Sequence, residues 1–387
     1  MTLRPSYGKT NLSSNSSYTD TRNKFVEVTL RYVLTYLSHL SKPIDNSIKI
    51  TILADDDYYS QTRSKPAASS SPGPDFTNFN VTLDDAHKTG LGSSAALVTA
   101  LVSSLLCYFN PPTTTTSPLP QQTIHNLAQA AHCAAQGKVG SGFDIAAAVY
   151  GSCLYRRFTP TVLERVGEPT SPGFGERLHR CIEDLDPSQK WDVEVSSRAV
   201  QIPDALKLVM CDVDCGSETP GMVRKVLQWR KEQPEEAALL WTALQQGTED
   251  LCRELRRLAG GGIGSSVDAA ALTGLGDIIA TVRSLVREMS DKSSVPVEPA
   301  VITELLDHCT DLPGVVGGVA PGAGGYDAVA LLVRNETEVL AHLSASLEHW
   351  KSGRTDGAKI GKVRLLGVRQ AEEGVKLEDA AKYSVWT

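Results

Sequence analysis

The sequence lacks the short patterns that reveal a metal site or a nucleotide site at once. Its eight cysteines are scattered, with no C-x-x-C pair and no cysteine–histidine spacing of the zinc type. No G-x-x-x-x-G-K-[ST] stretch occurs and no G-x-G-x-x-G follows a strand-like run, so neither a Walker A loop nor a Rossmann dinucleotide site is supported. We expect reduced, mostly buried thiols in a cytoplasmic protein.

An excess of positive charge and a long uncharged apolar run are also missing. The 387-residue chain carries a net charge of −7, which argues against wholesale nucleic-acid binding. No window of transmembrane length is free of charges, and the polar N-terminus has no apolar signal core. We expect a soluble chain of two or three domains, a monomer or homodimer, with no nucleic-acid or membrane partner.

Hydrophobic periodicity predicts an α+β protein. Apolar residues at three- and four-residue steps predict a helix over Lys24–Leu40, whereas Ile48–Ala54 alternates like a strand. Further helices are expected at 94–109, 121–136, 220–232, 235–258, 268–290 and 298–309. Further strands are expected at 191–200, 206–214, 329–333 and 362–368. Composition predicts surface loops at 61–80, 111–120 and 259–266 and a linker near 167–189.

Three glycine-rich stretches stand far apart in the chain. "GLGSSAA" (90–96) precedes a strongly apolar helix, whose first N–H groups lack intrahelical partners and can bind an anion. "GSGFD" (140–144) and "PGAGGYDA" (321–328) each join glycines to an aromatic residue and an aspartate. One such turn could be a serine-capped bend. Three of them together favour a shared phosphate-handling site.

These three stretches resemble motifs of the GHMP kinases, the superfamily of galactokinase, homoserine kinase, mevalonate kinase and phosphomevalonate kinase. Together with the run 125–158 and "GSET" (216–219), they are most similar to the fungal phosphomevalonate kinase branch. The resemblance implies a GHMP kinase fold: a ribosomal protein S5 domain 2-like N-terminal ATP-binding domain (1–170) and a ferredoxin-like C-terminal domain (190–387). It implies the reaction of ATP with (R)-5-phosphomevalonate in the mevalonate route to isopentenyl diphosphate and sterols.

The resemblance also implies site residues. Phosphoryl transfer to an acceptor that is already anionic needs cations and positioning more than a base. Lys88 and Asp144 are the expected catalytic residues. The ATP phosphates are expected on Gly90, Leu91, Gly92, Ser93, Ser94 and Ala95. Substrate contacts are expected from Lys138, Ser141, Gly142, Arg156, Ser217, Thr219, Gly324 and Gly325, although the "YRRF" arginines could equally form a solvated strand edge.

Two departures from the family pattern stand out. The stretch 124–143 contains no Asp or Glu, and Cys133 occupies the place where many relatives carry a Mg²⁺-binding glutamate. Mg²⁺ is therefore expected on Ser93 or Ser94, with Asp144 and the ATP phosphates. The chain also shows no opening A-P-G-K motif, so we expect an N-terminal domain that lacks its first strands, with exposed sheet edges.

Three readings remain open at this point. The chain could be an active phosphomevalonate kinase, another GHMP enzyme such as mevalonate kinase or diphosphomevalonate decarboxylase, or a weakly active or inactive nucleotide-binding relative. The run of three aspartates at 55–57 is expected to be a solvated turn rather than a metal cluster.

Overall fold

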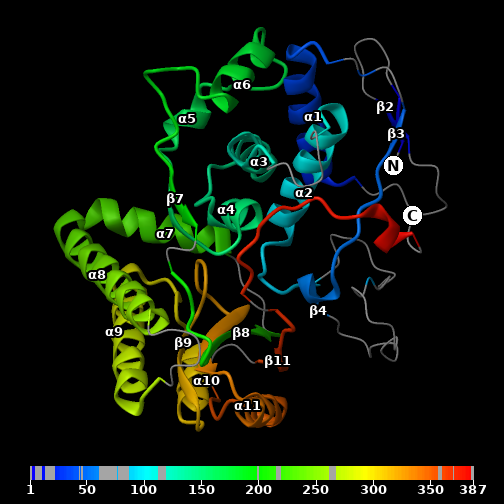
Figure 1. The fold of residues 1–387 in the computed structure, drawn as a ribbon. Coiled ribbons are helices and arrows are strands. Elements are labelled where there is room, and N and C mark those ends of the chain that lie inside the picture. Colours follow the sequence, from blue (N-terminus) through cyan, green and yellow to red (C-terminus); the bar gives the residue numbers. More distant parts are fainter. Residues whose placement is uncertain are drawn as a thin grey trace.

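The molecule consists of a mainly helical N-terminal part and a C-terminal part built on an antiparallel sheet (Figure 1). This computed structural model describes residues 2–4, 11–13, 22–42, 44, 47–60, 76, 87–111, 119–197, 200–214, 219–260, 267–355, 360–368 and 370–384. Most of each expected loop segment, at 61–80, 111–120 and 259–266, lies outside the described residues. The expected α+β class is confirmed.

The N-terminal helices share one apolar core. They are α1 (Lys24–His39), α2 (Ser93–Phe109), α3 (Gln121–Gln136), α4 (Phe143–Tyr150), the short α5 (Thr161–Glu164) and α6 (Phe174–Ile182). Helix α1 starts where the Asn23 side chain accepts hydrogen bonds from the Phe25 and Val26 amides, at 3.0 and 3.2 Å. Its buried Val33 and Leu37 belong to the same cluster as side chains of α2 and α3. The three helices expected over this region are confirmed.

Short strands flank these helices. β1 (Thr2–Arg4), β2 (Asn11–Ser13) and β3 (Ile48–Lys49) form a sheet in the order β2-β1-β3. Two antiparallel pairs are β4 (Tyr59–Ser60) with β5 (His87–Lys88) and β6 (Cys153–Arg156) with β7 (Glu194–Ser197). The strands expected at 48–54 and 191–200 exist but are shorter than predicted.

The stretch 167–189 is not a plain linker, as the sequence suggested. It contains α6, whose Phe174, Leu178 and Ile182 are buried in the N-terminal core. The prediction was wrong because Pro, Gly and charged residues dominate the composition of the stretch. The apolar residues that anchor it recur at four-residue steps, which is a helical spacing.

The C-terminal part has the β-α-β-β-α-β order of a ferredoxin-like fold, as expected. Its sheet runs β11-β8-β10-β9, from β8 (Leu206–Val213), β9 (Val315–Val319), β10 (Ala328–Arg334) and β11 (Val363–Leu365). Its helices are α7 (Thr219–Glu232), α8 (Pro234–Ala259), α9 (Ala269–Ser293), α10 (Ala300–Thr310) and α11 (Thr337–His349), followed by the 3₁₀ turn η2 (Ala380–Tyr383). The expected helices and strands of this region are present, whereas β9 and α11 were not predicted.

Strand β10 shows why the sheet is covered on both faces. Val329, Leu331 and Val333 point to the side of α10 and α11, whereas Leu332 packs with residues of α8 and α9. Side chains of a strand alternate between faces, so a nearly continuous apolar run requires cover on both sides. Helix α9 is long and apolar enough to cross a membrane, but its Leu275 and Ile279 are buried against this sheet.

The chain after β11 returns to the N-terminal part (Figure 1, red). The Gly367 amide donates to Asp57 Oδ2 at 2.9 Å, and Arg364 Nη2 donates to the Tyr59 carbonyl at 3.2 Å. Farther along, the Val375 amide donates to the Val149 carbonyl, at the end of α4. The aspartate run 55–57 is therefore not merely solvated, since Asp57 helps join the two parts.

Candidate functional site

The fold brings the three glycine-rich stretches together. A Cβ built on Gly92 would lie 3.5 Å from Cβ of Asp144, and one on Gly90 would lie 3.8 Å from Cβ of Ala328. A Cβ on Gly322 would lie 3.9 Å from the ring of Phe143. A single added methyl group at each glycine would thus reach van der Waals contact, so each stretch lies directly beside another one. The expected shared site therefore exists as a geometric unit.

Two helices begin at this site. Gly92 precedes α2 with φ 76°, and Gly142 precedes α4 with φ 79°, a left-handed conformation that favours glycine. Neither glycine has a side chain that could accept from the first N–H groups of its helix. Apart from the Ile145 amide, which donates to Asp144 Oδ1, those groups and the positive end of each helix dipole can face an anion. Two helix N-termini meeting at one point suit a polyphosphate better than a single charge.

A buried threonine anchors the loop that precedes α2. Thr89 is fully buried, and its hydroxyl donates to the Asp57 carbonyl at 2.6 Å. Lys88 pairs with Tyr59 across the short β4–β5 ladder, and its side chain is exposed. An ammonium group at this place, adjacent to the loop, can reach a bound phosphate without a desolvation cost in the free protein.

The turn before α4 is held from two sides. Gln129 Nε2 donates to the Gly142 carbonyl at 2.7 Å, and the Tyr155 hydroxyl donates to the Ser141 carbonyl at 3.1 Å. A Cβ on Gly142 would come within 2.6 Å of the Gln129 amide. Asp144, in the first turn of α4, accepts from the Ile145 amide through Oδ1 at 3.0 Å. The carboxylate thus has a defined direction and remains partly open to solvent.

The C-terminal glycine turn is shaped by its own backbone. Gly325 N donates to the Val297 carbonyl at 2.9 Å, and Gly324 N donates to the Pro321 carbonyl at 3.1 Å. A Cβ on Gly324 would approach the Val297 oxygen to 2.1 Å, so only glycine fits there. Because protein carbonyls already accept from both amides, these glycines shape the turn; their expected substrate contact stays a prediction.

The remaining expected substrate residues are spread out. Arg156 forms an ion pair with Glu194 on the neighbouring strand, N···O 3.1 Å, with side chains 70% and 67% exposed. This is the solvated strand-edge arrangement that the sequence left open. Ser217 and the side chain of Thr219 lie outside the described residues.

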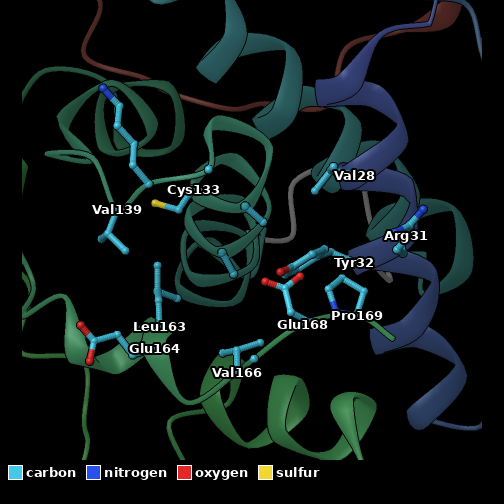
Figure 2. A pocket seen from close by; sticks show the side chains of 15 residues that line it. Val28, Arg31, Tyr32, Cys133, Val139, Leu163, Glu164, Val166, Glu168 and Pro169 are labelled. Atoms are coloured by element: carbon cyan, nitrogen blue, oxygen red, sulfur yellow. The ribbon is translucent and has the colours of Figure 1, made fainter. Parts of the chain in front are cut away.

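A pocket of about 400 Å³ adjoins the turn before α4 (Figure 2). Lys138 lines it, together with Cys133 of α3 and with residues of α1 and of the segment 163–169. Figure 2 shows the Glu168 carboxylate beside the Tyr32 ring. Burial and then the charge of Glu168 raise the pKa of Tyr32 to about 12, so its phenol stays a proton donor at neutral pH.

One residue at the site was missed by the sequence analysis. His132 of α3 is buried, and its Nε2 lies 3.0 Å from Ser94 Oγ and 3.9 Å from Asp144 Oδ2. A signal was present: His125, Gln129, His132 and Gln136 recur at helical steps, which places four polar side chains on one face of the helix.

The donor set fits a magnesium ion carried by phosphates rather than a protein cage. Among the described residues no group of three or more His, Cys, Asp or Glu side chains could hold a metal. Mg²⁺ prefers oxygen ligands and binds through one or two carboxylates plus substrate phosphates, which Asp144 and the hydroxyls of Ser93 and Ser94 can complement. Burial raises the pKa of the Cys133 thiol, so that residue does not replace the glutamate of the family pattern.

Comparison with known proteins agrees with this geometry. The model of the GHMP kinases N-terminal domain matches residues 70–152, which include the first two glycine-rich stretches. The chain is 53% identical to a phosphomevalonate kinase of Aspergillus fumigatus, over 94% of this chain and 75% of that protein.

This chain belongs to the phosphomevalonate kinase family. A phosphomevalonate kinase of Gibberella zeae is 46% identical over 94% of this chain and 78% of its own length. The peroxisomal phosphomevalonate kinase of Arabidopsis thaliana is 30% identical over 81% and 73%. The crystal structure of the Lin0012 protein from Listeria innocua shares the fold, with TM-score 0.60 and 17% identity over 92% of this chain and 82% of that one. The GHMP kinase fold expected from the motifs is thereby confirmed.

Proposed function

We propose that this chain transfers the γ-phosphoryl group of ATP to (R)-5-phosphomevalonate, which yields ADP and 5-diphosphomevalonate. The observation that carries the proposal is the convergence of the three glycine-rich stretches, with Asp144 against Gly92. An oxygen of the acceptor phosphate attacks the γ-phosphorus while the bond to the ADP oxygen breaks. The acceptor is largely a dianion at neutral pH, so no strong base is required.

The site residues have separate roles in positioning the two polyanions, ATP and 5-phosphomevalonate. The N–H groups at the start of α2 bind ATP phosphates, and Lys88 adds a mobile positive charge beside them. Lys138 contacts the acceptor from the pocket beside the turn before α4. The Asp144 carboxylate orients Lys88 or the metal-bound nucleotide instead of removing a proton.

Mg²⁺ is the proposed metal, with the hydroxyls of Ser93 or Ser94 and the Asp144 carboxylate as protein ligands. When bound with ATP, the ion neutralises charge on the transferring phosphoryl group. We also propose a cytoplasmic location. Fractionation of cells that express a tagged chain tests this against the peroxisomal location named for the Arabidopsis relative.

The decisive assay couples ADP release to NADH oxidation, with purified monodisperse protein, ATP, Mg²⁺ and 5-phosphomevalonate. Mevalonate in place of 5-phosphomevalonate is the control for another GHMP activity. We expect turnover with 5-phosphomevalonate alone and none in excess EDTA. A folded sample that binds an ATP analogue but turns over neither substrate would refute the proposal and favour a nucleotide-binding role.

A further inference from the structure

His132 joins the first turn of α2 to the first turn of α4. Its Nε2 atom lies 3.0 Å from Ser94 Oγ, a hydrogen-bonding distance, and 3.9 Å from Asp144 Oδ2, which is longer than a hydrogen bond. Only 3% of the residue is exposed. One buried nitrogen therefore touches a side chain of the phosphate loop and faces the carboxylate of the second motif.

The tautomer of the imidazole decides which atom donates in the hydrogen bond between Ser94 and His132. Gln136 Nε2 lies 3.4 Å from the same Nε2, and an amide NH₂ group can only donate. When the ring carries its proton on Nδ1, the Nε2 lone pair faces both groups, and the Ser94 hydroxyl, the nearer of the two, donates to His132. A serine that donates its proton in this way keeps both oxygen lone pairs for a ligand at the start of α2.

The hydrogen bond also removes a choice of conformation. A serine side chain has three staggered rotamers, and the hydrogen bond to His132 selects one of them for Ser94. The imidazole itself is fixed by burial and by a ring contact with Phe25 of α1, at 5.5 Å between centroids. The ring therefore has a fixed position, and its hydrogen bond fixes the position of the Ser94 hydroxyl.

We propose that His132 is a positioning residue for phosphoryl transfer: by accepting the Ser94 proton it fixes the Ser94 oxygen, next to Asp144, for contact with the ATP phosphates and their metal ion. This inference rests on the proposed kinase function. His132 does not contact the ligand itself; it orients Ser94, and a partner that orients a ligating group affects how well that group binds.

Three substitutions separate this role from a merely structural one. His132→Leu removes the hydrogen bond. His132→Gln places an amide near the position of Nε2, whereas His132→Asn places one near Nδ1, too short to reach Ser94. His308→Leu is the matched control, since His308 of α10 forms a similar hydrogen bond to a serine, Ser346 Oγ at 2.8 Å, in the C-terminal part.

Two readouts are needed. Steady-state kinetics should show that His132→Leu and His132→Asn lose about 10- to 100-fold in kcat while the KM for 5-phosphomevalonate changes little, and that His132→Gln regains most of the rate. Calorimetry with a non-hydrolysable ATP analogue should show that His132→Leu weakens binding with Mg²⁺ more than binding in EDTA. His308→Leu should lower the unfolding temperature without either effect.

The outcomes are distinguishable. Wild-type rates and Mg²⁺-dependent binding in His132→Leu would overturn the inference, as would a folded His132→Gln that is as impaired as His132→Leu. If His132→Leu does not fold, the comparison of His132→Gln with His132→Asn decides, and equal behaviour of the two refutes the role. If wild-type protein shows no turnover, the proposed function fails, while the binding comparison still tests His132.

Discussion

Gly92 and Asp144 lie so close that a Cβ on the glycine would stand in van der Waals contact with Cβ of the aspartate, at 3.5 Å. The φ of 76° at Gly92 adds a second restriction, because a residue with a Cβ adopts this conformation at a cost of about 1–2 kcal/mol. We predict that Gly92→Ala loses activity far beyond this modest loss of stability, since any shift of the loop also displaces Asp144. Urea denaturation and kcat, measured on the same sample, test this; proportionate losses would contradict it.

Asp144→Asn tests the charge of the carboxylate without removing its shape. Asparagine keeps an oxygen that can accept from the Ile145 amide, so the turn should persist. We expect kcat to fall by about 100-fold or more, with an unchanged unfolding temperature, because the lost charge orients cations in the transition state. A variant with wild-type kcat would remove Asp144 from the proposed site.

Lys88→Ala tests the cation beside the phosphate loop. The side chain is exposed, so the free energy of unfolding should change by less than about 0.5 kcal/mol. We expect kcat to fall on the order of 100-fold, with a weaker apparent affinity for ATP. Lys190→Ala, at another exposed lysine, should leave both unchanged. Equal effects of the two substitutions would show that only general surface charge matters.

The buried ion pair of Arg283 and Glu298 supports the C-terminal glycine turn. Arg283 Nη2 lies 2.8 Å from Glu298 Oε1, with side chains 7% and 1% exposed, and the preceding Val297 carbonyl accepts from Gly325. Arg283 also pairs with Asp307 at 2.8 Å, so Glu298→Gln leaves the buried guanidinium one acidic partner and should cost less than the about 3–5 kcal/mol of a fully broken buried pair. Chemical denaturation measures this. Arg283→Met combined with Glu298→Leu should be less destabilised than Glu298→Gln; if it is more destabilised, the pair itself carries the stability.

His125 predicts a loss of stability in acid. Burial lowers the pKa of His125, and the hydrogen bond to Asn126 opposes this only in part. The folded state therefore holds the ring neutral at a pH where the unfolded chain binds a proton. Stability is complete above the unfolded pKa of about 6.5 and falls below it, by at most about 1.4 kcal/mol per pH unit from this group. Denaturation between pH 7 and 5 should show a smaller slope in His125→Gln than in wild type.

Periodicity in the sequence was sufficient for the regular elements. The 3.6-residue pattern predicted α1, α3 and the helices α7 to α10 to within a few residues, because each of them buries an apolar face whose residues recur at helical spacing. The pattern missed α4, α5, α6 and α11, and Pro and Gly around α6 concealed its three buried side chains. The sequence did not indicate a partner for the aspartate run 55–57, because the amide that binds Asp57 belongs to Gly367, which follows β11 and is 310 residues away in the chain.

The candidate site likewise has a part that the sequence predicts and a part that only the fold determines. The glycines, Asp144 and Lys88 are visible in the sequence because helix starts that bind anions require small residues and polar groups at fixed local spacing. The contacts that unite them are non-local: Gly90 with Ala328, Gly92 with Asp144, and Ser94 with His132. Local chemistry thus determined which residues could hold phosphates. Only the packing of α2, α3 and α4 decided which of them meet, because the distance between side chains far apart in the chain is set by the core that holds their helices.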